Sequence, residues 1–200
     1  MLKRLFDFFF SLIGLIILSP LIFIISILII IDSKGGIFYK QKRVGKNNKD
    51  FYLIKFRTMK TGADKQGLLT VGSKDSRITK VGFFLRKHKL DELPQLINIL
   101  KGDLSFVGPR PEVRKYIELY DERQKQVLKV KPGLTDYASL EYINESEILS
   151  KTANPEKFYI EKIMPAKLEL NLKYINESGI KTDIKIIYKT LRKILFISDI

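Results

Sequence analysis

Cysteine and tryptophan are absent from the chain, and His88 is its only histidine. The lack of cysteine excludes disulfides, thiolate zinc sites, iron–sulfur clusters and a cysteine nucleophile. One histidine cannot supply a two-histidine metal site or a relay of several histidines. Any chemistry must therefore come mainly from carboxylates, hydroxyls, lysines and arginines.

Acidic residues are few compared with basic ones. The 200 residues include 36 Lys and Arg but 22 Asp and Glu, so the net charge is +14. This charge favours an anionic partner: nucleic acid, anionic lipid or a phosphorylated metabolite. Hydrophobic residues make up 45% of the chain, which excludes a disordered tail and allows one ordinary domain with a real core.

Charge is nearly missing from residues 5–31, where Asp7 is the only charged side chain. The 24 residues 8–31 form a long apolar run, and a helix of about 20 residues spans the hydrocarbon core of a bilayer. A secretory signal is disfavoured because the run is too long and no small-x-small cleavage motif follows it. A buried core helix is disfavoured because the run is apolar on every face. We therefore predict insertion into a membrane.

The topology of this run has two solutions. Lys3 and Arg4 precede it and several lysines follow it, and positive flanks favour the cytoplasmic side. Ser19-Pro20 in its middle is expected to kink or break a helix, and the serine hydroxyl can bond a freed carbonyl. A re-entrant helix with both ends on one face explains both features. A straight, kinked spanning helix is the alternative.

Beyond residue 33 the pattern is mostly helical with a small β element. Residues 37–40 and 51–56 predict two short strands around a turn at 43–48. Residues 34–60 hold nine basic residues and one acidic residue, which favours a cationic rim on an anionic membrane or contacts to phosphate. Residues 61–76 predict a flexible loop. Helices are predicted over 80–90, 95–100, 113–130, 155–164 and 166–176. A last helix begins at Thr182 and either lies in the membrane interface or packs on the core.

Two short segments carry candidate site residues. Pro94 suits a first helical turn, which places Asp91 at a helix start, where an anion is favoured. A plain helix N-cap is the alternative role for Asp91. Pro109 and Pro111 bracket Arg110 and stiffen its backbone, so its planar guanidinium can clamp an oxyanion. A rigid turn with a solvated arginine is the alternative there.

Residues 90–96 (LDELPQL), 100–105 (LKGDLS) and 106–111 (FVGPRP) resemble the bacterial sugar transferases, and more narrowly the small monotopic phosphoglycosyl transferases. Weaker matches such as 55–59 (KFRTM) and 131–133 (KPG) extend the resemblance over nearly the whole chain. It implies an α+β, mostly helical monotopic membrane protein. Residues 1–33 would form a re-entrant membrane helix broken at Ser19-Pro20. Residues 34–200 would form a catalytic domain with interfacial amphipathic helices, on the cytoplasmic face of a bacterial cytoplasmic membrane.

The resemblance also implies a reaction. Such enzymes move a phospho-sugar from a UDP-sugar to a polyprenyl (undecaprenyl) phosphate, release UMP, use Mg²⁺ and form a covalent intermediate on an aspartate. By position, Asp91 would be the nucleophile and Glu92 its partner, and both would bind Mg²⁺. Arg86 and Arg110 would clamp phosphate, with Lys55 and Arg57 as weaker candidates. A carboxylate can form an acyl phosphate, and Mg²⁺ needs only oxygen ligands, so these residues suit the chemistry.

The chain departs from the commoner family pattern in its second half. Residues 133–142 lack the tryptophan of the usual Thr-Gly-Trp-Ala, and Asn171 stands where many members carry Asp. The motifs therefore specify neither the sugar nor the oligomeric state. A membrane-anchored glycosyltransferase that releases UDP and a non-catalytic, basic anion-binding module are the alternatives. No nucleic-acid recognition motif is evident, so no nucleic-acid partner is expected.

Overall fold

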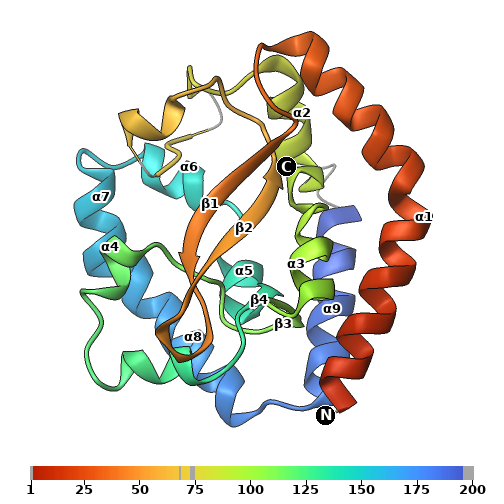
Figure 1. Cartoon of the computed structure of the whole chain (residues 1–200). Coiled ribbons are helices and arrows are strands. Elements are labelled where there is room, and N and C mark those ends of the chain that lie inside the picture. Colours follow the sequence, from red (N-terminus) through yellow and green to blue (C-terminus); the bar gives the residue numbers. More distant parts are fainter. Residues whose placement is uncertain (1, 68, 73–74, 196–200) are drawn as a thin grey trace.

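The structure is a computed structural model that describes residues 2–67, 69–72 and 75–195. Two small two-stranded sheets stand among many helices, as the predicted α+β class requires (Figure 1). The α-helices are α1 Leu2–Asp32, α2 Lys80–Lys87, α3 Gln95–Lys101, α4 Arg114–Ile117, α5 Tyr137–Glu141, α6 Glu145–Ser150, α7 Pro155–Phe158, α8 Met164–Asn176 and α9 Ile180–Leu195. Five shorter segments are η1 Lys46–Asn48, η2 Ala63–Gln66, η3 Leu90–Glu92, η4 Gln124–Lys129 and the π-helical η5 Tyr159–Ile163.

Helix α1 is long and apolar enough to cross a membrane. It runs through Ser19 and Pro20 without interruption and curves along one side of the molecule, so the helix is not broken at that dipeptide (Figure 1). Proline cannot donate a hydrogen bond to the carbonyl four residues earlier, here that of Ile16. The Ser19 hydroxyl donates to this carbonyl over 2.8 Å, as the sequence predicted. The serine therefore repairs the backbone at the proline.

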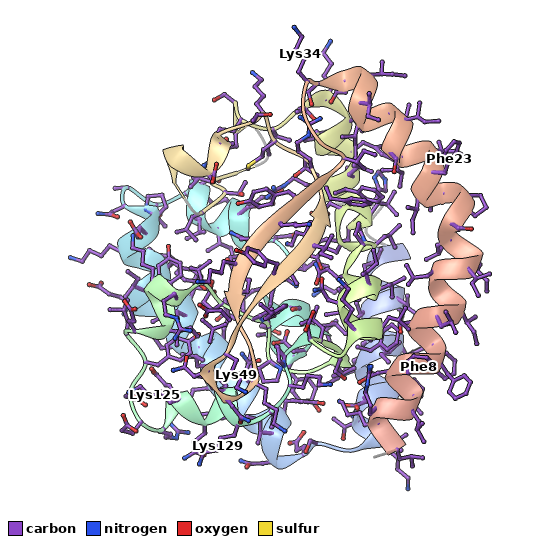
Figure 2. All side chains as sticks on the ribbon, viewed as in Figure 1. Phe8, Phe23, Lys34, Lys49, Lys125 and Lys129 are labelled. Carbon is purple, nitrogen blue, oxygen red and sulfur yellow. The ribbon has the colours of Figure 1, made fainter. Side chains whose placement is uncertain are left out.

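The two faces of α1 differ. Figure 2 shows Phe8 and Phe23 on its outer side, pointing away from the rest of the molecule, and they are 39% and 67% exposed. On the inner side, Ile25 and Ile29 are buried in a cluster with Phe56 and Leu85. Burial of one stripe explains the packing, while the large exposed apolar face suits a lipid environment.

Both ends of α1 are bonded to the same body of the protein. Near its beginning, the Lys3 ammonium donates to the Asp183 carboxylate at the start of α9 over 2.6 Å. Arg4 donates to two carbonyls at the end of α3, each over 2.7 Å. At its other end, the Asp32 carboxylate accepts a hydrogen bond of 2.9 Å from the Val81 amide at the start of α2. The helix is therefore fixed to the domain along its length.

The predicted hairpin is present as β1 Phe38–Val44 and β2 Asp50–Phe56, which pair antiparallel. A second pair, β3 Ser105–Val107 with β4 Gly133–Thr135, is parallel and was not predicted. Its strands approach closely at Gly108 and Gly133, where an added Cβ on either would overlap the backbone of the other segment. This close contact holds the segment after β3 against β4.

The prediction of one helix over 113–130 was wrong. The segment contains only α4 and η4, separated by a turn. In that turn the Asp121 carboxylate accepts a hydrogen bond of 2.7 Å from the Gln124 amide, which offers the backbone an alternative to a continuous helix. The two short pieces still pack: Tyr116 and Val127 join a buried cluster with Leu168 of α8.

Helix α9 packs on the core, which is one of the two roles that the sequence left open for the last helix. Ile186 is fully buried, in a cluster with Val107 and Tyr174. On the other side, Ile184 and Tyr188 are 53% and 64% exposed. One face of α9 therefore packs on the core, and an apolar face is left outside. The sequence pattern of this helix continues to Phe196, which lies outside the described residues.

Candidate active site

The dyad Asp91-Glu92 lies in η3, a single turn that leads through Pro94 into α3. The turn begins after Lys89, which adopts the left-handed conformation with a φ of 56°. Few non-glycine residues adopt this conformation, because it crowds the Cβ against the backbone. The chain thereby reverses between α2 and α3 and brings the dyad to the wall of a cavity of about 980 Å³.

Glu92 is held by two cations. The Arg110 guanidinium donates to both carboxylate oxygens of Glu92, and the Lys55 ammonium donates to one of them over 3.3 Å. Burial alone would raise the pKa of Glu92, but these two positive charges outweigh it and hold that pKa well below its usual range. The Glu92 carboxylate is therefore ionised and fixed in position.

Asp91 has a different environment. It is buried, and its carboxylate accepts no hydrogen bond and forms no ion pair with any residue in the described part of the chain. Burial and the neighbouring Glu92 carboxylate raise the pKa of Asp91, although the charge of Lys55 works against them. The alternative of a plain N-cap is wrong, because Pro94 occupies the N-cap position of α3. The Asp91 carboxylate has no partner among the described residues, whereas the charge of Glu92 is neutralised by cations. Asp91 is therefore available to a substrate.

Arg110 is positioned by the segment between β3 and β4. Its amide donates to the Asp136 carboxylate over 3.2 Å, and the other oxygen of Asp136 caps α5 by accepting from the Ser139 amide over 2.6 Å. The Arg110 side chain also donates to the Leu134 carbonyl over 3.4 Å. Arg110 therefore belongs to a loop that is held by hydrogen bonds, and not to a solvated turn. Sequence reasoning missed Asp136, although an Asp three residues before Ser139 is a typical N-cap signal.

Lys55 lies on β2 and faces the dyad, as predicted for a cation near the site. Its side chain is 19% exposed. Burial lowers the pKa of Lys55, and Glu92 partly restores it. Lys55 thus adds positive charge to the base of the site without being bonded to Asp91.

Arg86 of α2 lies beside the cavity and donates to the Thr70 hydroxyl over 2.8 Å and to the Thr58 hydroxyl over 3.4 Å. Its charge lowers the pKa of Asp91, in opposition to burial. Arg86 therefore connects the dyad to the 61–76 segment. Among the described residues of that segment, Arg77 donates to Asp75 and to the carbonyl of Gly67.

Arg57 is not brought to the dyad. Its guanidinium donates to the carbonyls of Ser33 and Lys34, at the end of α1. These are groups that a helix C-terminus leaves without partners, and a positive charge is favourable there. The structure thus gives Arg57 the role of holding the end of α1, and its predicted contact with phosphate stays a prediction.

Lys89 is a residue that sequence reasoning missed. It lines the cavity, and its charge lowers the pKa values of both Asp91 and Glu92. Within the described residues it forms no ion pair. The signal available in the sequence was a basic side chain two positions before Asp91, which is hard to distinguish from the many other lysines.

The described residues contain no group of three or more acidic or histidine side chains that could hold a metal ion. Of the two dyad carboxylates, only that of Asp91 has no partner among the described residues, since both oxygens of Glu92 receive hydrogen bonds. Mg²⁺ commonly binds through one or two carboxylates and completes its shell with waters and substrate phosphates. The dyad fits such an ion only together with a phosphate ligand.

Comparison with known proteins identifies the family. A family model described as Bacterial sugar transferase matches residues 1–197, so the chain belongs to the bacterial sugar transferase family. The resemblance carried by residues 90–111 is thereby confirmed.

Relatives include a UDP-N-acetylgalactosamine-undecaprenyl-phosphate N-acetylgalactosaminephosphotransferase of Aeromonas hydrophila, 34% identical over 97% of this chain and 44% of that protein. The uncharacterized sugar transferase EpsL of Bacillus subtilis is 38% identical over 97% of this chain and 87% of that protein. The UDP-glucose:undecaprenyl-phosphate glucose-1-phosphate transferase of Escherichia coli is 34% identical over 96% and 40%. The chain thus spans less than half the length of two of these relatives.

Proposed function

We propose that the protein transfers a sugar phosphate from a UDP-sugar to a polyprenyl phosphate such as undecaprenyl phosphate, with release of UMP. The observation that carries the proposal is the contrast within the dyad. Asp91 is buried without a partner, while Glu92 is neutralised by Arg110 and Lys55. Relatives named as undecaprenyl-phosphate transferases support the same reaction.

The proposed reaction has two displacements. An oxygen of the Asp91 carboxylate attacks the phosphorus that carries the sugar. The bond from this phosphorus to the bridging oxygen breaks, and UMP leaves with the bonding electrons. An oxygen of the acceptor phosphate then attacks the same phosphorus, the bond to Asp91 breaks, and the carboxylate is regenerated. A covalent intermediate of this kind divides one difficult step into two.

Positive charge around the dyad supports this chemistry. Both substrates are anionic, and an anionic nucleophile must approach an anionic phosphate. Arg86, Lys89 and the exposed third of the Arg110 side chain can offset this repulsion in a partly dry cavity. Glu92 is held in place by its two cations. It acts as the partner of Asp91 and fixes the position of these charges beside Asp91.

Mg²⁺ is proposed as the cofactor, held by Asp91 and Glu92 together with substrate phosphate oxygens. When bound, it would neutralise phosphate charge and favour departure of UMP. Because both oxygens of Glu92 already receive hydrogen bonds, Asp91 offers the more accessible oxygen atoms.

We also propose that α1 is re-entrant, with both of its ends on the cytoplasmic face of a bacterial cytoplasmic membrane. Lys3 and Asp32, at the two ends, bond to the same body through Asp183 and Val81. A spanning helix would place its ends on opposite faces and break one of these contacts. Because the chain has no cysteine, Leu2→Cys and Lys34→Cys provide single labelling sites. Both should react only from the cytoplasmic side, and labelling of either from outside contradicts the re-entrant topology.

The intermediate can be tested by mass spectrometry of the intact protein. With a UDP-sugar alone and rapid quenching, the parent should release UMP and gain the mass of a phospho-sugar. Asp91→Asn is nearly isosteric and should do neither while remaining folded. Release of UDP instead of UMP would favour a glycosyltransferase. An adduct on the Asp91→Asn protein would place the nucleophile elsewhere.

A further inference from the structure

Part of the cavity wall that contains the dyad is apolar and comes from three helices. Its side chains are Phe10 and Leu18 of α1, Leu96 of α3, and Ile187, Leu191 and Ile194 of α9. None of these six side chains carries a charge, in contrast to the cations around Asp91. Thr190 and Lys193 of α9 also line the cavity, and they bond to the Thr135 hydroxyl and the Leu140 carbonyl. The cavity therefore has a charged part and an apolar part.

The two parts are joined at Leu134. This residue lines the cavity and packs in one apolar cluster with Leu18 and Leu96, while its carbonyl accepts the hydrogen bond from Arg110. Leu134 thus contacts the apolar wall through its side chain and Arg110 through its backbone carbonyl. A single elongated ligand can occupy both parts at once.

The apolar part opens where the protein presents apolar side chains to its surroundings. Phe10 on α1 is 52% exposed and Leu191 on α9 is 54% exposed, although both line the cavity. The outer faces of these two helices carry further exposed apolar residues, among them Ile17 and Ile184. A ligand in this groove can therefore extend from the dyad into lipid without crossing water.

We propose that this groove, defined by Phe10, Leu18, Leu96, Ile187, Leu191 and Ile194, binds the first isoprenoid units of the acceptor lipid, with its phosphate directed toward Asp91. This inference rests on the proposed function, which supplies a polyprenyl phosphate as acceptor. The UDP-sugar suits the groove poorly, because its pyrophosphate and ribose would face uncharged, apolar side chains. An isoprenoid chain matches them, since each buried methylene favours binding about fourfold.

Helix α9 offers a matched pair of positions for the test. Leu191 lines the groove and is 54% exposed, whereas Ile184 does not line it and is 53% exposed. A tryptophan at either position adds the same bulk to a similarly exposed site. Leu18→Trp and its outward neighbour Ile17→Trp form a second pair on α1. Two half-reactions are measured: UMP release from UDP-sugar alone in a single turnover, and transfer to undecaprenyl phosphate or to the shorter farnesyl phosphate.

Leu191→Trp and Leu18→Trp should raise the KM for undecaprenyl phosphate by at least about tenfold, by displacing two or more methylenes. They should also reduce the preference for the long acceptor over farnesyl phosphate. Single-turnover UMP release should be unchanged. Ile184→Trp and Ile17→Trp should stay within about twofold of the parent, as surface substitutions do.

Equal effects within each matched pair would overturn the groove assignment. So would slower UMP release in the groove variants, because the substitutions would then act on the donor half of the site. A parent protein that releases no UMP and forms no adduct with UDP-sugar alone would instead count against the proposed mechanism. In that case the chain-length comparison in the complete reaction still tests the groove.

Discussion

The ion pair between Arg110 and Glu92 gives a prediction that distinguishes the role of Arg110 in positioning Glu92 from a role in folding. Arg110→Ala removes the guanidinium that donates to both oxygens of Glu92. Glu92 is only 17% exposed, and removing one partner of a buried pair costs about 3–5 kcal/mol. Lys55 remains 3.3 Å away and Arg110 is itself 33% exposed, so we expect a smaller loss of stability, about 2 kcal/mol.

The same substitution should reduce turnover about 10²–10³-fold, as loss of one fixed charge-stabilising donor does in other active sites. Arg110→Lys should recover only part, because lysine lacks the planar fork that meets two oxygens. Chemical unfolding in detergent micelles measures the stability, and UMP release measures turnover. Membrane insertion should be unaffected, since Pro109 and Pro111 hold the loop.

The decisive measurement is a double-mutant cycle with Glu92→Gln. An uncharged amide does not need the guanidinium, so Arg110→Ala should cost less than about 1 kcal/mol of stability in the Glu92→Gln background. The activity losses should likewise be far from multiplicative, because the two residues act as a unit. If the stability costs of the two substitutions simply add, Arg110 does not act through Glu92 and the argument is refuted.

Three further predictions concern the titration of Asp91, the role of Lys89 and the arginine that holds the end of α1. The acidic limb of the pH–rate profile for UMP release should lie at higher pH than for an ordinary aspartate, because burial raises the pKa of Asp91. Glu92→Gln removes a negative charge beside Asp91 and should move this limb to lower pH. Lys55→Met removes a positive charge beside Asp91 and should move it to higher pH. Shifts in the same direction for both variants would contradict the assignment to Asp91. Lys89→Asn keeps a residue that tolerates the left-handed conformation and should raise the KM for the UDP-sugar about tenfold, the effect of losing one charge-assisted hydrogen bond; an unchanged KM would exclude Lys89 from donor binding. Arg57→Met should lower stability by about 2–3 kcal/mol through the uncapped end of α1, measured by thermal unfolding in micelles. An effect of Arg57→Met on the KM for the donor without loss of stability would restore its role at phosphate.

The sequence allowed prediction of the features that depend on local pattern. The apolar run indicated α1, two short apolar and aromatic runs around a turn indicated the β1–β2 hairpin, and Pro94 marked the start of α3. Features that depend on contacts between distant segments were missed. The strands β3 and β4 have three residues each, too few for any periodicity, and exist because Gly108 and Gly133 permit close approach.

The candidate site divides in the same way. Asp91, Glu92 and Arg110 were selected as candidates because their motif is distinctive, and the structure pairs Arg110 with Glu92. Arg57 was assigned to phosphate because it is basic and lies near other matching residues. Only the packing of α1 shows that the Arg57 guanidinium donates to carbonyls at the end of that helix. The charge of a basic residue can be read from the sequence, but the group that it contacts depends on the fold.

Helix α1 is also part of the scaffold of the dyad. Buried Ser11 and the small Gly14 let α1 lie close to α3, where a Cβ on Gly14 would be 3.3 Å from Leu96. Arg4 of α1 holds the last carbonyls of α3, and the first turn of α3 follows directly from the dyad. Any change in the tilt or depth of α1 must therefore move α3 and, with it, Asp91. In the proposed reaction a soluble donor and a lipid acceptor meet at one phosphorus atom, so attaching the dyad to the helix proposed to enter the membrane gives both substrates the same reference position.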